Sequence, residues 1–343
     1  MGKIPEFNYR SFLADAIRDY LDYLDHLGLS IVSQASSLKR IDGFLVENHI
    51  GCIQQCDSRL WLQLMAHHQG QVKGTTLRGW RTAFHGLCRY LVRQGWMPES
   101  PVPAFPIPRL ENYRPYVFSI DELRRLFDWL QQQADHSGNP LTSFRFRSRY
   151  VFYHLLYACG LRVSEGVRVT TDDYSAEQRT LFIQPSKFHK DRLIPIGKRA
   201  AANLQSLLEL RQRRLGIPPA GPFFLALPKR RAYNPGTVSQ YFQTAMQHLG
   251  IYRPQVTYGH CTYGTPHVHE LRRAFAIHRL MRWYHQHVDV EAKLPLLATY
   301  MGHARFEYTK TYLTLTRQLL SEAGHRFARG FDRLDWMPHD PEL

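Results

Sequence analysis

The chain has 343 residues, 44% of them hydrophobic and 13% aromatic, which is enough for two globular domains with separate cores. Its 44 lysines and arginines exceed its 29 aspartates and glutamates, and the resulting charge of +15 favours a polyanionic partner such as nucleic acid. No apolar run approaches the roughly 20 residues of a membrane span. The N-terminus MGKIPEFNYR lacks the apolar core of a signal peptide, so we expect a cytoplasmic protein with no membrane partner.

The cysteines do not suggest a disulfide framework. There are five, an odd number at irregular spacings, which fits a reducing compartment. Cys52 and Cys56, with His67 and His68 downstream, match no structural zinc spacing, and the HxH pair at 267–269 has no evident carboxylate partners. We therefore expect neither a metal nor another cofactor.

Residues 1–97 are predicted to form a small helical bundle. Apolar residues recur at helical spacing near 9–27, 33–48, 58–68 and 75–94. Cations and threonines gather at the start of the fourth helix, where free backbone N–H groups are suited to a phosphate; a solvated basic face is the alternative. The candidate DNA contacts here are Lys73, Thr75, Thr76, Arg78 and Arg81.

Residues 98–115, PESPVPAFPIPRLENYRP, contain six prolines. Proline fixes φ and lacks a backbone N–H group, so this segment excludes a helix and disfavours a central strand. We predict a semi-rigid linker that separates the N-terminal bundle from a C-terminal domain over 116–343, which includes a C-terminal tail.

The C-terminal domain is predicted to be mainly helical with a small β-sheet. Ser119 and Glu122 form a capping box that opens one helix, and a second, apolar helix ends at Gly160. Thr180–Gln184 and Arg192–Ile196 are the predicted strands of a hairpin whose turn is PSKFHKD.

Further helices are expected over 197–215, 235–249, 267–284 and 290–301, whereas the turn-rich segment 250–265 is expected to be a loop. Basic residues gather near the start of the apolar helix and at the tip of a loop before 235. The candidate DNA contacts of this domain are Arg145, Arg147, Lys229, Arg230 and Arg231.

Separated stretches of this domain carry an ordered series of cationic, imidazole and phenol groups. Taken singly each is a weak signal, since most arginines and most hairpin-turn lysines are solvated surface residues. Together they could form an anion site that contains its own nucleophile. They are Arg162 in GLRVSE, Lys187 in the hairpin turn, His269 and Arg272 in HELRR, His303 after Gly302, and Tyr312 nine positions later.

This series resembles the tyrosine recombinase, or phage-integrase, family over nearly the whole chain. The resemblance implies a helical core-binding domain followed by an α+β catalytic domain. It also implies a site-specific DNA recombinase that cleaves and rejoins strands through a 3′-phosphotyrosine, without ATP or a divalent metal. By this resemblance the active-site residues are Arg162, Lys187, His269, Arg272 and His303, and the nucleophile is Tyr312.

The chemistry fits these residue types. Two forked guanidiniums can stabilise the charge that develops on the non-bridging phosphate oxygens. Tyr312, with an ordinary pKa of about 10, needs this positive field and a base, for which His269 is the candidate. Lys187 is suited to protonate the departing 5′ oxygen, and His303 to donate a hydrogen bond to the phosphate.

Several alternatives stay open. Within the turn SKFHK, Lys190 could replace Lys187 as the general acid, although the register of the following DRLIPI favours Lys187. Glu165 is expected to be a structural partner for a nearby cation. The expected role is integration, excision or transposition of a mobile element. The alternatives are dimer resolution of the Xer type, DNA relaxation of the type IB topoisomerase kind, and a DNA-binding regulator that no longer cuts.

The resemblance also implies partners. They are double-stranded DNA at specific recombination sites and further copies of the chain, assembled as a tetramer of two synapsed dimers. The apolar residues of the tail after Tyr312 suit packing on its own domain or on a neighbour, and the resemblance implies docking on the adjacent protomer. These residues are Leu315, Leu319, Leu320, Phe327 and Phe331.

Overall fold

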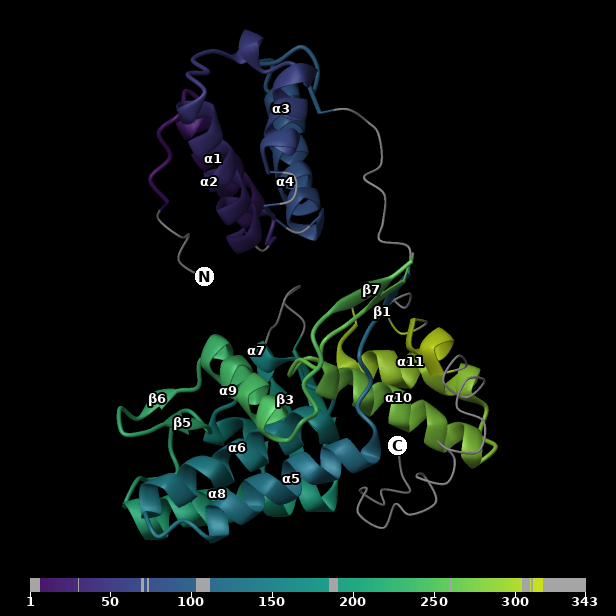
Figure 1. Ribbon diagram of the computed structural model, residues 1–343. Helices are drawn as coiled ribbons and strands as arrows, with labels where there is room; N and C mark the ends of the chain where they lie inside the picture. Colours follow the sequence, from purple (N-terminus) through teal and green to yellow (C-terminus); the bar gives the residue numbers. More distant parts are fainter. Residues whose placement is uncertain are drawn as a thin grey trace. The chain divides into compact units, whose positions relative to one another are not determined.

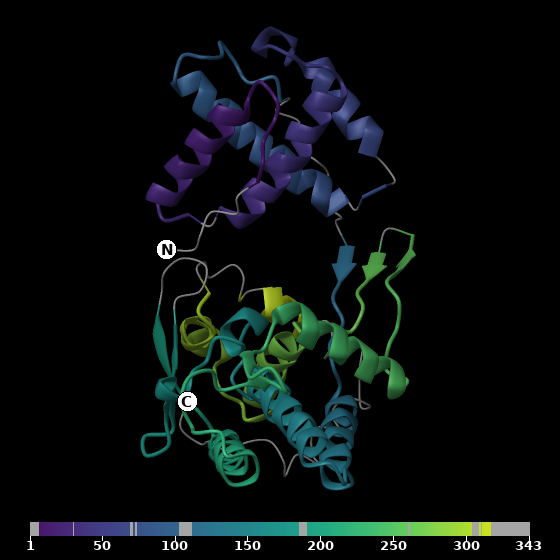
Figure 2. The ribbon, with the colours of Figure 1, turned by 90° about the vertical axis from the view of Figure 1, so that its left-hand side faces the viewer.

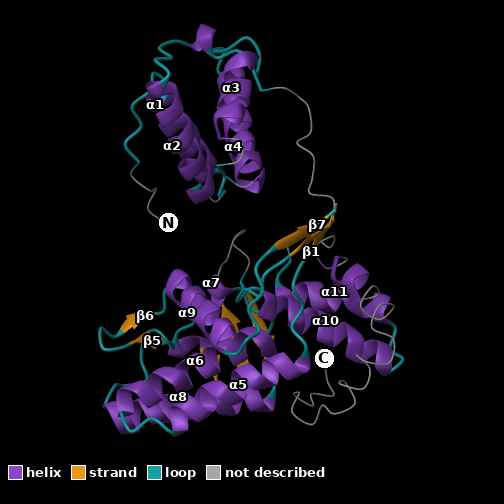
Figure 3. Ribbon diagram, in the orientation of Figure 1, coloured by secondary structure: helices purple, strands orange, loops and turns teal. Residues whose placement is uncertain are grey.

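The described part of the chain forms two compact units, each with its own buried core (Figure 1). Helices dominate both units and the strands are short, as Figure 3 shows. The prediction of a mainly helical protein with a small amount of β-sheet is confirmed. None of the described helices is both long and apolar enough to cross a membrane. The computed structural model describes residues 7–29, 31–68, 71–72, 74–102, 112–184, 191–259, 261–303, 309 and 311–316.

The N-terminal unit is a helical bundle whose apolar faces meet in one core. Its first helix begins later than the apolar pattern near Tyr9 suggested. The reason is the buried carboxylate of Asp42, whose Oδ1 accepts hydrogen bonds from the backbone N–H groups of Arg10 (3.0 Å) and Ser11 (2.8 Å) and holds them outside the helix. The helices are α1 (Ala14–His26), α2 (Val32–Glu47), α3 (Ser58–His68) and α4 (Gly74–Arg93), with a short 3-10 turn, η1 (Ile53–Gln55).

The C-terminal unit is built around α6 (Pro140–Ala158). This helix is buried on nearly every side, because α5 (Ile120–Asp135), α8 (Lys198–Leu215) and α10 (Glu270–His285) all pack against it. Figure 1 shows α5, α6 and α8 grouped together and α10 beside α11 (Val290–Met301). The remaining helical elements are α7 (Val163–Gly166), the 3-10 turn η2 (Thr171–Asp173) and α9 (Pro235–His248).

Helix starts in this unit follow the predicted caps. At the start of α5, the Ser119 hydroxyl accepts from the Glu122 N–H (3.2 Å) and the Glu122 carboxylate accepts from the Ser119 N–H (2.9 Å). At the start of α9, Oδ1 of Asn234 accepts from the N–H of Gly236 at 2.8 Å. Local sequence therefore fixes where these helices begin.

The predicted strand pair is present. β3 (Thr180–Ile183) and β4 (Arg192–Pro195) run antiparallel, with Ile183 opposite Arg192, and β2 (Tyr174–Ser175) extends the sheet on the other side of β3. The turn that joins β3 to β4, with Lys187 and Lys190, lies outside the described residues. A second, two-stranded sheet consists of β5 (Leu225–Ala226) and β6 (Arg231–Ala232).

A third sheet joins the linker to the segment before α10. β7 (Val256–Tyr258) and β8 (Cys261–Tyr263) form an antiparallel hairpin, and β1 (Asn112–Arg114) pairs in parallel with β8. Figure 2 shows the three strands side by side. The prediction of a loop over 250–265 was therefore wrong. β1 lies far earlier in the chain, so no local pattern predicts its pairing, and the β7–β8 hairpin has strands of only three residues in a turn-rich segment.

Candidate active site

A buried carboxylate, Glu165, is the centre of the site. It lies in α7, just after the helix break at Gly160, and is 2% exposed. Three arginines from separate elements surround it. Arg162 Nη1 lies 2.7 Å from Oε1, Arg192 Nη2 lies 2.9 Å from Oε2, and Arg272 Nη1 lies 3.9 Å from Oε2. Three guanidiniums against one carboxylate leave an excess of positive charge, which suits an anion such as a phosphodiester.

The arginines keep Glu165 ionised. Burial alone would raise the pKa of Glu165. The hydrogen bond and charge of Arg192, the backbone N–H of Arg162 and the charge of Arg272 together lower this pKa to about 2. Glu165 thus acts as a structural partner of cations, in agreement with the expectation from its sequence position.

Arg162 and Arg272 both bind the C-terminal end of α11. Arg272 is 2% exposed, and its guanidinium donates to the carbonyl of Met301 through Nη2 (2.8 Å) and to the carbonyl of Gly160 through Nη1. Arg162 Nη2 donates to the carbonyl of Gly302 at 3.1 Å. The two guanidiniums are therefore held on adjacent backbone carbonyls before any substrate arrives.

Arg192 is a residue of the site that the sequence analysis missed. Besides its contacts with Glu165, its Nε donates to the carbonyl of Tyr300 at 3.0 Å, so it joins β4, α7 and α11. Gly302 packs directly on it, since a Cβ at Gly302 would lie 2.7 Å from Nη1 of Arg192. The signal in the sequence was a cation at the start of a strand, two residues before the buried Ile194. Its partners are distant in sequence, and no local pattern marks them.

His303 and Tyr312 lie against each other. Their ring centroids are 5.8 Å apart at an interplanar angle of 30°. Nδ1 of His303 is 2.7 Å from the hydroxyl of Thr309, which is fully buried. Tyr312 is 8% exposed and is one of the groups that act electrostatically on Arg272, whose pKa burial and the charge of Arg162 lower to about 10. The nine-residue spacing therefore places the phenol beside the arginine cluster.

Both histidines of the site are neutral at physiological pH. Burial, followed by the charges of Arg272 and Arg162, lowers the pKa of His303 to about 3. His269, the N-cap of α10, still reaches solvent, yet crowding by the surrounding protein and the charges of Arg272 and Arg273 lower its pKa to about 4. A neutral imidazole can accept a proton from a phenol or donate a hydrogen bond to a phosphate.

The structure thus brings together Arg162, His269, Arg272, His303 and Tyr312. Lys187, like its alternative Lys190, lies outside the described residues. Among the described residues, no group of three or more His, Cys, Asp or Glu side chains is placed to hold a metal ion.

The candidate DNA contacts lie in both units. In the N-terminal unit, Thr76 is exposed and Arg78 and Arg81 are half-buried in the first turns of α4. Lys73 and the side chain of Thr75 fall outside the described part of the chain.

In the C-terminal unit, Arg145 donates through Nη2 to the carbonyl of Leu227 (3.1 Å), and Arg147 pairs with Asp135 at 2.9 Å. The three basic residues of the β5–β6 hairpin are exposed. They are Lys229, Arg230 and Arg231.

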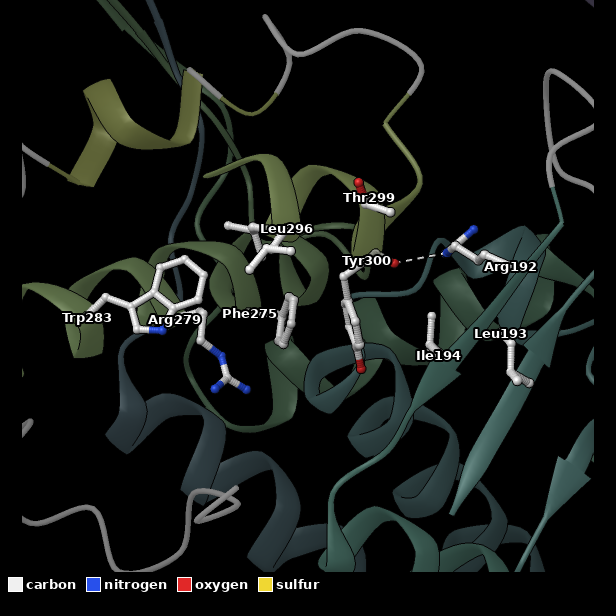
Figure 4. Close-up of a pocket in the computed structure, with 10 residues that line it drawn as sticks. Arg192, Leu193, Ile194, Phe275, Arg279, Trp283, Leu296, Thr299 and Tyr300 are labelled. Carbon is white, nitrogen blue, oxygen red and sulfur yellow. Dashed lines mark hydrogen bonds between the residues drawn. The ribbon is translucent and has the colours of Figure 1, made fainter. Parts of the chain in front are cut away.

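An apolar pocket of about 230 Å³ adjoins the site (Figure 4). Phe275 and Trp283 from α10 and Leu296 from α11 form its walls, and Leu296 is 56% exposed. One edge is Arg192, whose hydrogen bond to the carbonyl of Tyr300 is drawn in Figure 4. The pocket therefore shares one side chain with the arginine cluster.

Known proteins similar to this chain are DNA recombinases and integrases by name. The putative integrase/recombinase y4rB of Sinorhizobium fredii is 26% identical over 326 residues, which are 94% of this chain and 99% of that protein. The tyrosine recombinase XerC of Psychromonas ingrahamii is 27% identical over 316 residues, which are 90% of this chain and 95% of that protein.

Solved structures share the fold. A lambda integrase tetramer bound to a Holliday junction has a TM-score of 0.60 at 17% identity, covering 88% of this chain and 76% of that one. The Tn1549 transposon integrase in complex with transposon right end DNA has a TM-score of 0.60 at 13% identity, covering 90% and 98%. Residues 118–318, more than half of the sequence, match the model of the phage integrase family, and the chain therefore belongs to that family.

Proposed function

We propose that this protein is a site-specific DNA recombinase that cleaves and rejoins DNA strands through a 3′-phosphotyrosine intermediate. One observation carries the proposal: Arg162 and Arg272 hold the carboxylate of Glu165 and the carbonyls at the end of α11, and His303, which follows that end, stacks on Tyr312. These groups bind a phosphodiester and attack it, and the matched family is one of integrases.

In the proposed reaction the Tyr312 hydroxyl oxygen attacks the scissile phosphorus. A new O–P bond forms as the bond to the 5′ oxygen breaks. The phenol proton passes to the neutral imidazole of His269, and Lys187 supplies a proton to the departing 5′ oxygen. The products are a 3′-phosphotyrosine and a free 5′-hydroxyl. Because the phosphodiester is exchanged for another phosphodiester, the hydroxyl of a second strand can reverse the step.

Arg162 and Arg272 stabilise the charge that develops on the phosphate. Both guanidiniums are fixed in advance by backbone carbonyls of Gly160, Met301 and Gly302, so they need little reorganisation when the substrate binds. Preorganised donors of this kind contribute about 10²-fold to 10³-fold each to a reaction rate. We propose that His303, neutral and held beside Thr309, donates a further hydrogen bond to the phosphate.

Covalent trapping tests this function. The bound DNA is first located by footprinting, and a nicked duplex of that site is then incubated with the protein. Wild-type protein is expected to form an adduct that survives denaturation. Tyr312→Phe is expected to bind the duplex and form none, whereas the control Tyr252→Phe behaves as wild type. An adduct that persists in Tyr312→Phe would contradict the proposal, and binding without any adduct would favour a regulator that does not cut.

A second assay separates recombination from DNA relaxation. A plasmid with two copies of the footprinted site is expected to yield deletion or inversion products. Relaxation of supercoils without any exchange between the two sites would favour the topoisomerase alternative. Within recombination, we propose integration, excision or transposition of a mobile element, with support from the relative named integrase/recombinase.

We further propose that the chain works on double-stranded DNA as a tetramer of two synapsed dimers. Support comes from structural neighbours described as a lambda integrase tetramer and a lambda integrase dimer bound to DNA. The apolar pocket beside Arg192 is a suitable receptor for the tail of an adjacent protomer, since the tail carries Phe327 and Phe331 and the pocket leaves Leu296 exposed.

Removal of the tail tests this assembly. Deletion of the residues after 318 is expected to leave the fold and duplex binding intact and to abolish the synaptic complex on a native gel. Leu296→Asp, which places a charge in the receiving pocket, is expected to have the same effect. Recombination at the wild-type rate in both variants would remove tail exchange from the proposal.

A further inference from the structure

The sheet formed by β1, β8 and β7 has one face that the proposed reaction does not use. In the register of this sheet, Tyr263 lies opposite Arg114 on one side and Val256 on the other. Tyr258 is two positions beyond Val256 on β7, so its side chain lies on the same face. Arg114, Tyr258 and Tyr263 therefore form a single surface, here called the tyrosine face.

The tyrosine face is open to solvent and its side chains contact one another. Tyr258 is 70% exposed and Tyr263 is 42% exposed. The two ring centroids are 6.2 Å apart at an interplanar angle of 68°, and the guanidinium of Arg114 lies 6.0 Å from the ring centroid of Tyr263. Two large exposed rings beside a cation form a platform of the kind that binds nucleic acid.

The charge around this face favours a polyanion. Residues 250–268 and 112–120, which contain the three strands and their flanks, include no aspartate or glutamate. The same segments contain Arg114, Arg253 and His267. Tyrosine and arginine also occur at protein interfaces, but the charge of +15 and the lack of carboxylates in these segments favour a polyanion. Duplex DNA offers phosphates to the cation, and sugars and base edges to the rings.

Contacts on the opposite face of the sheet and at its end join the three strands to one another. The hydroxyls of Thr257 and Thr262 are 3.1 Å apart across the β7–β8 pair. The Tyr113 ring lies directly over Gly264, where a Cβ would be 2.4 Å from the phenol oxygen, and the N–H of Gly264 donates to the carbonyl of Arg114 at 2.8 Å. The three strands are therefore joined to one another, and the tyrosine face lies on one continuous sheet (Figure 2).

We propose that the tyrosine face binds the DNA duplex directly, at a place separate from the arginine cluster. Arg114 contacts a backbone phosphate, and the rings of Tyr258 and Tyr263 pack against sugars and base edges. The proposal rests on the proposed function in one respect, that duplex DNA is the substrate. It gives a role to the hairpin at 256–263, which the catalytic residues do not require.

Fluorescence anisotropy with a labelled random-sequence duplex, measured on the full chain over a range of salt concentrations, tests the tyrosine face. The Tyr258→Ala, Tyr263→Ala double variant is expected to bind about tenfold more weakly, with an unchanged slope of log K against log salt, because the rings it removes carry no charge. Arg114→Gln is expected to reduce the magnitude of that slope by about one, because it no longer neutralises a phosphate.

Tyr113→Ala is the matched control, because Tyr113 is 43% exposed and lies on the opposite face of the same sheet. It is expected to bind the duplex as wild type does. Equal weakening by Tyr113→Ala would show that the sheet had only loosened, and would overturn the proposal. Wild-type DNA affinity in the double variant would also overturn the proposal. If that variant bound DNA normally but no longer self-associated, the face would bind a second copy of the chain instead of DNA.

The covalent-trapping assay separates this inference from the proposed function. At saturating concentrations of the footprinted duplex, the double variant is expected to form the Tyr312 adduct at the wild-type rate. If neither the wild type nor the double variant formed an adduct, the proposed function would fail. The anisotropy result would still show whether the tyrosine face binds DNA. A rate defect that saturating DNA does not restore would assign Tyr258 and Tyr263 to catalysis and overturn the inference.

Discussion

Arg192 acts on the site through Glu165. It contacts both carboxylate oxygens, and its hydrogen bond and charge are the largest of the effects that lower the Glu165 pKa against the opposing effect of burial. A forked guanidinium can hold both oxygens at once, which an ammonium cannot do. Arg192 is therefore a positioning residue that keeps Glu165 ionised and, through Glu165, keeps Arg162 and Arg272 aligned.

Arg192→Gln is expected to raise the pKa of Glu165 and so to raise the pH below which the stability contributed by this carboxylate is lost. Glu165 has a folded pKa of about 2, below its ordinary value of 4.5, so its stabilising contribution is complete above the ordinary value and disappears as pH falls through the folded one. In the variant this loss occurs at higher pH. Urea unfolding of the full chain, measured as a function of pH, gives the shift.

Two comparisons make that result specific. Arg192→Lys, which restores the charge but not the fork, is expected to give an intermediate profile. Arg168→Gln, which removes an exposed arginine just after α7, is expected to leave the profile unchanged. A wild-type profile in Arg192→Gln would show that Arg192 does not act through Glu165.

The neutral state of His269 and His303 is measurable in the free protein. NMR of histidine-labelled protein is expected to show titration at about 4 for His269 and about 3 for His303. Both values lie below the ordinary pKa, so the unfolded chain binds these protons at higher pH than the folded one, and stability falls as pH drops below about 6.5. Arg162→Gln, which removes a nearby charge, is expected to raise both pKa values, whereas Arg162→Lys raises them less. Titration of either histidine at its ordinary pKa would contradict the described electrostatics.

At the scale of elements, the sequence predicted the helices and strands whose caps or pairing partners are close in the chain. The bounds of α3 and α11 match the predicted ones because their caps are adjacent in sequence, Asp289 before α11 and Gly302 after it. The β3–β4 hairpin was predictable for the same reason. The sheet of β1, β7 and β8 was not predicted, because β7 and β8 are only three residues each and β1 pairs with β8 across a long stretch of sequence.

The same distinction between local signals and distant contacts applies to the site. The order of motifs, through its resemblance to a known family, predicted Arg162, His269, Arg272, His303 and Tyr312 as one site. The clustering around Glu165 depends on contacts between α7, α10, α11 and β4, which no local pattern contains. Arg192 was missed because its role exists only through those contacts.

Gly302 offers a test of how the end of α11 supports the site. Gly302 has a φ of 67°, and an added Cβ would also collide with the Arg192 guanidinium. Gly216 ends α8 with a φ of 59°, and an added Cβ there would meet nothing within 4 Å. Gly216→Ala is expected to cost about 1 kcal/mol from the left-handed backbone alone. Gly302→Ala is expected to cost roughly 2 kcal/mol or more and to slow adduct formation by displacing Arg192.

Urea unfolding of the full chain and the trapping assay measure the two effects. The decisive comparison is between the variants: equal loss of stability, or equal adduct formation, would mean that the contact between Gly302 and Arg192 does not matter. If Gly302→Ala forms the adduct slowly in buffer without urea, where the protein remains folded, the effect arises from the geometry of the site and not from unfolding.

At the scale of the whole molecule, we expect cations of both units to contribute to DNA binding, in keeping with the charge of +15. The candidate contacts are divided between the units, with Arg78 and Arg81 on α4 and a basic group of three on the β5–β6 hairpin. If each group binds phosphates, each contributes separately to the release of counterions from the DNA.

The salt dependence of binding by full-length variants tests this division. Arg78→Gln with Arg81→Gln, and the triple change of Lys229, Arg230 and Arg231 to Gln, are each expected to reduce the slope of log K against log salt by roughly 0.9 for every phosphate that is no longer bound. Arg213→Gln, which removes an exposed arginine paired with Glu209 on α8, is the control and is expected to change nothing. When the two sets are combined, the reductions are expected to add, because cations on separate units that grip one duplex release counterions independently. A set that leaves the slope unchanged is not part of the interface, and a combined reduction no larger than the greater single one would mean that only one unit at a time holds the DNA.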